Sequence, residues 1–185
     1  MVERATNETR QWYALRVTYQ REMRVKAELD AMKVANFVPM QYKIIVRNGR
    51  RVKKLVASIH NLIFVYMTTE EMRNYRMTTH QPVRYIMRRD TRQPLVVPKE
   101  QMDNFIAVAG TYSEQLIYLK NDLSTFNKGE LVRILGGPFE GAVGRFVRVR
   151  GDRRVVVSVE GIVAVATTFI HPSLLEHIDE SSNSI

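Results

Sequence analysis

The chain has 185 residues, a length that suits two small domains better than one compact core. Its composition, 45% hydrophobic and 25% charged, is typical of a globular protein and excludes a fibrous or broadly disordered one. No apolar run approaches the roughly 20 residues of a membrane helix, and residues 1–10 are polar, so we expect a cytoplasmic protein without membrane contact. Cysteine is absent, which excludes disulfides, thiolate metal sites and thiol nucleophiles.

The net charge of +9 is distributed unevenly along the chain. From Thr125 onward the sequence has seven basic and seven acidic residues, so the first 124 residues carry the whole excess. A basic N-terminal part that faces a polyanion, joined to a neutral part with another partner, would explain this asymmetry. A charge surplus that only keeps the protein soluble explains it equally well.

Two signals dominate the first hundred residues. Val25, Leu29 and Met32 recur at helical spacing and predict an amphipathic helix. Asn48-Gly49 is the strongest short hairpin signal, because both residues tolerate the positive φ of a type I′ turn. The runs Phe37–Val46 before this turn and Val52–Ala57 after it are extended in character, so we expect a helix followed by a hairpin.

Capping residues delimit the other helices of this part. Thr69 is expected to cap one helix, and Pro98 to open another that Gly110 ends. The predicted strands are Trp12–Val17, Phe37–Val46, Val52–Ala57, Asn61–Thr68 and Val83–Met87, and the predicted helices are Glu22–Asn36, Thr69–Arg76 and Pro98–Gly110. This order indicates an α+β domain with a mainly antiparallel sheet, in which Asn61–Thr68 is a central strand covered on both faces.

The last third of the sequence differs in character, since seven of the nine glycines lie there. Short β-rich runs separated by glycine turns predict a small β-barrel. Its strands are Leu131–Leu135, Ala142–Val149, Arg154–Val159 and Ile162–Thr168. We expect a flexible tail at residues 1–10, an N-terminal domain at 11–109, a linker at 110–126, the barrel at 127–180 and a disordered tail at 181–185, in a monomer.

No catalytic cluster stands out among the polar residues. His171, Glu176 and His177 are weak metal candidates, because none forms a ligand pair at helical spacing. The glycine-rich Gly136–Gly144 lacks the Gly-Lys-Ser/Thr ending of a P-loop. The sequence therefore predicts a protein without cofactor or metal that is not an enzyme.

Cations gather around the predicted hairpin turn, with no acidic residue among them: Lys43, Arg47, Arg50, Arg51, Lys53 and Lys54. Such a ribbon can follow a phosphate backbone and release its counterions. Charges that protect an exposed strand edge from aggregation are the competing explanation.

A second basic group surrounds the helix that follows Thr69, and aromatic residues are interleaved with it. Arginine beside tyrosine can hold a phosphate and stack a base, which suits a single strand. A solvated surface is the alternative. The candidate nucleic-acid residues of this group are Arg73, Tyr75, Arg76 and Arg84.

Residues 128–145, KGELVRILGGPFEGAVGR, resemble the KOW motif that begins the C-terminal domain of NusG-like factors. The glycines of the motif permit a tight turn and close backbone passage, and its phenylalanine would plug the barrel end. The motif residues are Gly136, Gly137, Pro138, Phe139, Gly141 and Gly144. KOW domains also occur in ribosomal proteins, so a ribosome-associated or RNA-binding KOW protein is the alternative.

The N-terminal half extends the likeness. QWYALRV at residues 11–17, the helix after it and NLIFVYMT at residues 61–68 are similar to the NusG N-terminal (NGN) domain, so the resemblance covers about residues 11–178. Within the family the chain looks most like the specialised RfaH and UpxY paralogues, because Ile59-His60-Asn61-Leu62 replaces the usual Phe-Pro-Gly-Tyr.

The resemblance implies an elongation and antitermination factor that binds RNA polymerase, with a long polysaccharide or capsule operon as the target. Trp12, Ile59, Leu62 and Phe64 would then contact the β′ clamp helices, and the region from Thr69 would meet the β lobe, non-template DNA or nascent RNA. The KOW domain would recruit a ribosomal small-subunit protein or Rho. In RfaH this domain can become a helical hairpin, but the β-branched runs Val147–Val149 and Val155–Val157 predict a stable β form here.

Overall fold

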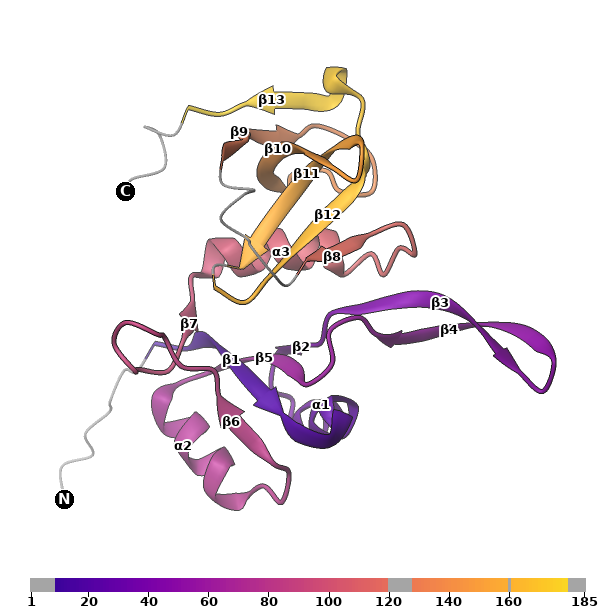
Figure 1. The fold of residues 1–185 in the computed structure, drawn as a ribbon. Coiled ribbons are helices and arrows are strands. Elements are labelled where there is room, and N and C mark those ends of the chain that lie inside the picture. Colours follow the sequence, from indigo (N-terminus) through magenta and orange to yellow (C-terminus); the bar gives the residue numbers. More distant parts are fainter. Residues whose placement is uncertain (1–8, 120–127, 160, 180–185) are drawn as a thin grey trace. The chain divides into compact units, whose positions relative to one another are not determined.

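The computed structural model describes residues 9–119, 128–159 and 161–179 and divides the chain into two compact units (Figure 1). The first unit contains the residues up to Val38 together with His60–Lys99, and the second contains Pro39–Ile59 and the residues from Glu100 onward. The predicted disordered tail, most of the predicted N-terminal tail and residues 120–126 of the predicted linker lie outside the described residues. The predicted α+β class with antiparallel sheets is confirmed.

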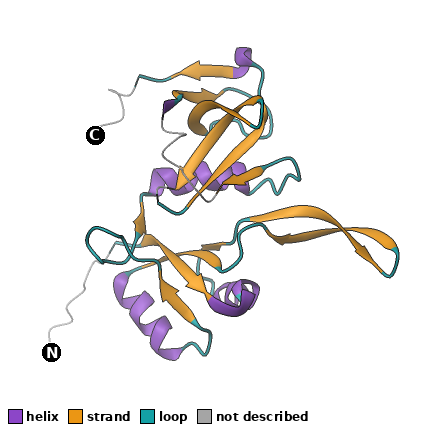
Figure 2. Cartoon of the chain, viewed as in Figure 1, coloured by secondary structure: helices purple, strands orange, loops and turns teal. Residues whose placement is uncertain are grey.

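The first unit is built on a five-stranded sheet in which every pairing is antiparallel (Figure 2). The strands, in sheet order, are β2 (Asn36–Phe37), β5 (Leu62–Met67), β1 (Gln11–Val17) and β6 (Val83–Tyr85), and β7 (Val96–Val97) also pairs with β1. β5 lies between β2 and β1, and five of its six residues are buried, as expected for a central strand.

Helix α1 (Glu22–Ala31) is shorter than the sequence predicts. Val25 and Leu29 of its apolar stripe are fully buried, whereas Met32 is 51% exposed. The helix ends there because Lys33 adopts a positive φ of 57°, and the chain then enters β2. The prediction that the helix continues to Asn36 is therefore wrong.

Helix α2 (Thr69–Thr78) is capped one residue earlier than expected. Thr68 Oγ1 accepts a hydrogen bond from the Glu71 N–H at 3.1 Å, and Glu71 Oε2 accepts one from the Thr68 N–H at 2.9 Å. This reciprocal capping box satisfies two backbone donors at the helix start. The Thr69 hydroxyl is 3.0 Å from the Tyr13 hydroxyl instead, so Thr69 as the cap is a wrong prediction.

A hairpin formed by β3 (Met40–Arg47) and β4 (Arg50–Ala57) is a separate two-stranded sheet in the second unit. Its register runs without a shift from Met40 opposite Ala57 to Arg47 opposite Arg50. Asn48 and Gly49 have φ of 50° and 73°, which confirms the predicted turn.

The second unit also contains α3 (Lys99–Ala109), apart from Lys99, and a six-stranded antiparallel sheet. In order, the strands of this sheet are β13 (Leu175–His177), β9 (Glu130–Ile134), β10 (Val143–Val149), β11 (Asp152–Val159), β12 (Val163–Phe169) and β8 (Ile117–Leu119). The valine-rich runs of β10 and β11 are strands in this structure.

Strand β8 lies inside the predicted linker and pairs with β12. Ile117 and Leu119 pack against a buried apolar cluster of the sheet. The Asn104 side chain of α3 accepts a hydrogen bond from the Val143 N–H at 2.9 Å. These contacts join the segment before the predicted barrel to the sheet itself.

Two glycines of the KOW-like segment serve different backbone needs. A Cβ on Gly144 would lie 2.6 Å from the Val156 carbonyl oxygen, so only glycine permits this close approach. Gly141 has open space around it and a φ of 84°, which favours glycine for conformational reasons. Phe139, two residues before Gly141, is 2% exposed. Throughout the described part of the chain, every helix is too short or too polar to cross a membrane.

Candidate functional site

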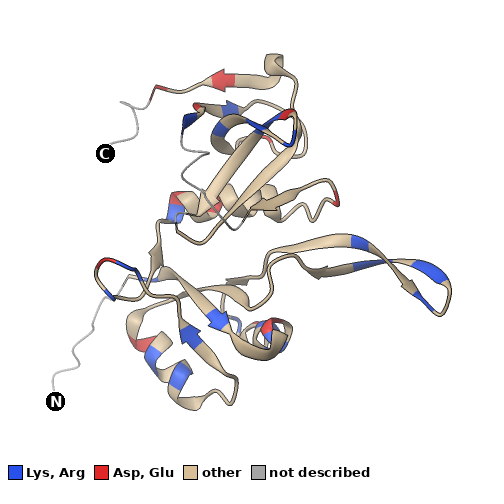
Figure 3. Ribbon diagram, in the orientation of Figure 1, with Lys and Arg blue, Asp and Glu red and all other residues tan. Residues whose placement is uncertain are grey.

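The hairpin carries the densest group of cations in the described residues, and no acidic residue lies on either strand (Figure 3). All six predicted nucleic-acid residues of this region are exposed: Lys43, Arg47, Arg50, Arg51, Lys53 and Lys54. The structure therefore brings the whole predicted set together on one ribbon.

The strand register divides these cations between the two faces of the ribbon. Lys43 lies opposite Lys54 and Arg47 opposite Arg50, and because side chains alternate along a strand, both pairs project from the same face. Like charges directly opposite each other destabilise a ladder, and a phosphate between them would relieve the repulsion. This four-cation face is the stronger candidate for nucleic-acid contact.

The other face of the ribbon is mixed in character. It carries Arg51 and Lys53 beside an aromatic and aliphatic row that begins at Tyr42. Lys53 Nζ lies 5.0 Å from the centre of the Tyr42 ring and 3.9 Å from a carboxylate oxygen of Glu114. Of the two cations on this face, Lys53 is therefore already engaged by other residues of the chain.

The second predicted group is only partly suited to nucleic acid. Arg73, Arg76 and Arg84 are exposed, but Tyr75 is 2% exposed and therefore cannot stack a base. The guanidinium of Arg76 lies 4.6 Å from the centre of the Tyr85 ring. Burial raises the pKa of Tyr85, and the hydrogen bond from Arg76 opposes that rise.

Arg16 lies beside one member of this group, Arg84, and sequence reasoning missed it. On the sheet Arg16 lies directly opposite Arg84, and both are exposed. Two arginines in register repel each other and form a place where an anion is stabilising. The sequence alone shows no signal for Arg16, because its proximity to Arg84 depends on the pairing of β1 with β6.

Three of the four predicted polymerase-binding residues share one face of the first sheet. The Tyr13 hydroxyl contacts Thr69 at the start of α2, so side chains of opposite parity on β1, including Trp12, point to the other face. Tyr66 lies opposite Trp12 and Phe64 opposite Ala14, which also puts Leu62 on the Trp12 face.

All four of these residues are buried. Trp12 is 9% exposed, Leu62 4% and Phe64 has no exposed surface. Ile59, which belongs to the second unit, is 6% exposed. The Trp12 ring packs against Tyr66 with a centroid separation of 5.2 Å. In this structure the four side chains therefore act as packing residues.

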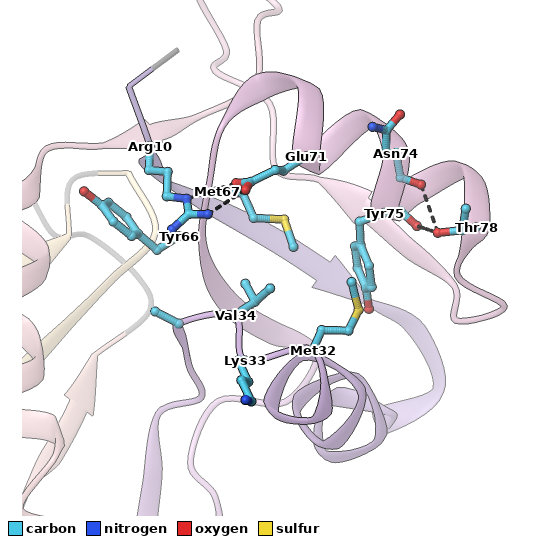
Figure 4. A pocket seen from close by; sticks show the side chains of 11 residues that line it. Arg10, Met32, Lys33, Val34, Tyr66, Met67, Glu71, Asn74, Tyr75 and Thr78 are labelled. Atoms are coloured by element: carbon cyan, nitrogen blue, oxygen red, sulfur yellow. Dashed lines mark hydrogen bonds and ion pairs between the residues drawn. The ribbon is translucent and has the colours of Figure 1, made fainter. Parts of the chain in front are cut away.

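A cavity of about 440 Å³ lies in the first unit beside α2 (Figure 4). Its lining residues are Arg10, Met32, Lys33, Val34, Ala35, Tyr66, Met67, Glu71, Asn74, Tyr75 and Thr78. At its rim Arg10 forms a 2.6 Å ion pair with Glu71, and this hydrogen bond lowers the pKa of Glu71. Tyr75 is the one predicted nucleic-acid residue among those that line it.

The residues considered as metal ligands have other partners. His171 Nδ1 accepts a hydrogen bond from the Ser173 N–H at 3.2 Å and caps a short 3-10 turn at Pro172–Leu174. Glu176 is 2.9 Å from Arg133, and His177 is 3.4 Å from Glu130. In the residues that the structure describes, no group of three or more His, Asp or Glu side chains is arranged to hold a metal ion.

Comparison with known proteins gives one family. The family model described as "Transcription termination factor nusG" matches residues 10–106, which is more than half of the chain. A solved structure described as "Domain interaction in Thermotoga maritima NusG" is 22% identical with a TM-score of 0.46, and the match covers 92% of this chain and 98% of that chain. No curated protein matches. The family match spans the whole first sheet and the cationic hairpin, and the chain therefore belongs to the NusG family of transcription factors.

Proposed function

We propose that this chain is a monomeric, cytoplasmic elongation and antitermination factor, which binds RNA polymerase and suppresses pausing and termination on a particular long operon, such as one for polysaccharide or capsule synthesis. The observation that carries the proposal is the NusG match over residues 10–106. A NusG-family factor is not an enzyme, and its work consists of binding. A factor that binds the closed, pause-resistant polymerase better than the open one shifts the population toward the closed state.

The polymerase contact is assigned to the Trp12 face of the first sheet, with Leu62 and Phe64, and to Ile59. The apolar character of these residues supports contact with the β′ clamp helices. A side chain without exposed surface contacts no partner, so Phe64 must become exposed if it is to touch the polymerase. Arg73 and Arg76 on the exposed side of α2 are assigned to the β lobe or to the nucleic acid near it.

Nucleic-acid contact is assigned to two cationic places. The first is the four-cation face of the hairpin, where two like-charged pairs stand in register. The second is the exposed pair Arg16 and Arg84. Each pair gains most from a phosphate at the point where the two charges repel each other. Non-template DNA or nascent RNA would supply that phosphate.

The strands β9 to β13 are assigned to a KOW domain at residues 127–180, which follows a linker at 110–126 that contributes β8 to the same sheet. Support comes from the positive φ at Gly137 and Gly141 and from the close backbone approach at Gly144, which this motif requires. The domain has as many acidic as basic residues from Thr125 onward, so its partner is not selected by net charge. A ribosomal small-subunit protein or Rho is the expected partner.

Transcription in vitro tests this proposal directly. Purified chain is added to core RNA polymerase elongating through a template that contains a pause site and a terminator. We expect longer read-through products and shorter pauses, with the full effect only on templates that carry the target operon's leader. The variant Arg16→Ala with Arg84→Ala should weaken the effect, whereas Arg24→Ala, an exposed arginine on α1, should leave it unchanged. Equal read-through with and without the chain on every template would contradict the proposal.

A further inference from the structure

The outer edge of β3, which is the edge that faces away from β4, is paired with another segment of the chain only near Tyr42. The Tyr42 N–H points away from β4 and donates a 3.0 Å hydrogen bond to the Tyr112 carbonyl. In an antiparallel pair every second residue points its N–H in the same direction, so the N–H groups of Ile44 and Val46 also face outward. Within the described residues these two groups donate to no other segment. Two successive backbone positions therefore remain open for pairing.

The side chains along this edge are unusually apolar for an exposed ribbon. Tyr42, Ile44 and Val46 project from one face and are 38%, 61% and 72% exposed, so exposure increases toward the turn. On the opposite edge, β4, the corresponding outward positions are Arg51 and Lys53. Charged residues of this kind block the addition of a further strand, whereas β-branched residues on a free edge favour it. The two edges of the hairpin are therefore not equivalent, and β3 is the receptive one.

Charge selects the occupant. The strands β3 and β4 carry six cations and no acidic residue, which excludes a second copy of this hairpin as the added strand. An acidic residue of the chain itself already pairs with the ribbon near its base. Glu114 lies on the same segment as Tyr112, whose carbonyl accepts the Tyr42 hydrogen bond, and its carboxylate is 3.9 Å from Lys53. A strand bound beside Ile44 and Val46, closer to the turn, would have Arg51 on the same face of the ribbon, because Arg51 lies opposite Val46.

We propose that the outer edge of β3 binds an extended acidic segment of a partner protein, which adds as a third strand. Its backbone carbonyls accept hydrogen bonds from the Ile44 and Val46 N–H groups, its apolar side chains cover those two residues, and a carboxylate pairs with Arg51. The four-cation face stays free, so a nucleic acid and the added strand occupy different faces. This inference does not depend on the proposed role in transcription.

A synthetic peptide of alternating Glu and Val, labelled with fluorescein, is the probe for the full-length chain. Anisotropy titration measures its affinity, and amide hydrogen exchange followed by NMR reports which backbone groups become protected. We expect protection of Ile44 and Val46 and none of Arg51 and Lys53. A peptide of alternating Lys and Val should not bind, because its charge has the wrong sign.

Proline substitution tests the outward N–H groups of β3 without removing the hairpin. The double variant Ile44→Pro with Val46→Pro removes both outward N–H groups but leaves the ladder to β4 intact, because those groups do not take part in it. We expect it to bind the peptide roughly tenfold more weakly. The matched control, Ile44→Thr with Val46→Thr, keeps both donors and isolates the apolar contribution.

Three results would overturn the proposal. The first is an affinity for the peptide that is the same in the proline double variant, the threonine double variant and the unchanged chain. The second is protection of β4 amides instead of β3 amides. The third is protection of Ile44 and Val46 by an oligothymidine and not by the peptide, which would assign this edge to nucleic acid. Far-UV circular dichroism and retained oligothymidine binding by the proline variant establish that the hairpin is still formed.

Discussion

The hairpin β3–β4 and the ladder β1–β5 are both antiparallel pairs rich in apolar residues, yet they differ in burial beyond the base of the hairpin, where Met40 and Ala57 are buried. Ile63, Phe64 and Val65 of the ladder have no exposed surface, whereas Ile44 and Val46 of the hairpin are more than 60% exposed. The ladder lies within a five-stranded sheet, and the hairpin is a sheet of two strands. Apolar composition therefore does not decide whether a strand is core, since that depends on how many neighbours cover it. Changes in the ladder should cost folding, and changes in the hairpin should cost binding.

Truncation of one apolar residue in each region gives the largest contrast. Phe64→Ala should lower the free energy of unfolding by about 3–5 kcal/mol, because it leaves a cavity in a fully buried site. Ile44→Ala, at an exposed site, should change it by less than about 0.5 kcal/mol. Urea unfolding of both variants followed by circular dichroism measures the difference. A comparable loss of stability in the two variants would show that the hairpin is part of the core.

Removal of the four-cation face sharpens the functional side of the comparison. The variant with Lys43, Arg47, Arg50 and Lys54 changed to Ala should bind single-stranded DNA more weakly and should reduce the slope of log affinity against log salt by up to about 3, at roughly 0.7 per phosphate contact. Fluorescence anisotropy at several salt concentrations measures both quantities.

The matched control changes the other hairpin cations, Arg51→Ala with Lys53→Ala. It should reduce the slope by less than the value of about 1.4 that two contacts at roughly 0.7 each would give, because Lys53 is engaged by Tyr42 and Glu114. An equal reduction of the slope per removed cation in the two variants would remove the distinction between the faces.

The sequence predicts the elements whose signals are local. Asn48-Gly49 encodes the hairpin turn, and the nearly continuous apolar run at Leu62–Met67 encodes a central strand. Features that depend on strand register cannot be predicted from the sequence alone. Examples are the pairing of Arg16 with Arg84 and the division of the hairpin cations between two faces. The burial of Tyr75 is also missed, because a tyrosine between arginines reads equally well as a surface residue.

Short elements fail for a further reason. β8 spans three residues and β7 two, too few for any periodicity to appear, and both form because a neighbouring strand offers hydrogen bonds. The cap of α2 is displaced by one residue because Thr68 and Thr69 are chemically equivalent, and only the reciprocal bond with Glu71 selects Thr68.

The capping box provides a smaller effect within the first unit. Thr68→Ala should destabilise the chain by about 1 kcal/mol, because it leaves the Glu71 N–H without its acceptor. Thr69→Ala is the matched control, and it should cost less because it removes only the contact with the Tyr13 hydroxyl. Thermal unfolding of the two variants decides between them, and a larger loss in the Thr69 variant would contradict the assignment of the cap.

Acid should produce the smallest effect. The hydrogen bond from Arg10 holds the pKa of Glu71 below its ordinary value of 4.5. The lowered pKa contributes stability that is present above pH 4.5 and is lost as the pH falls through the folded-state value. Because the pair is partly exposed, the contribution is at most about 1 kcal/mol.

Thermal unfolding of the unchanged chain and of Glu71→Gln from pH 7 to pH 3 tests this effect. The difference in stability between the two proteins should shrink as the pH falls below 4.5. A constant difference across this range would show that the charge of Glu71 does not contribute.

The central claim, that this NusG-family chain acts by binding RNA polymerase, is tested most directly by titrating the full-length chain against immobilised core enzyme. We expect a saturable one-to-one complex at submicromolar concentration, with amide-exchange protection of β1 and β5 in the bound state. Absence of any complex at micromolar concentrations of both proteins would contradict the proposed function.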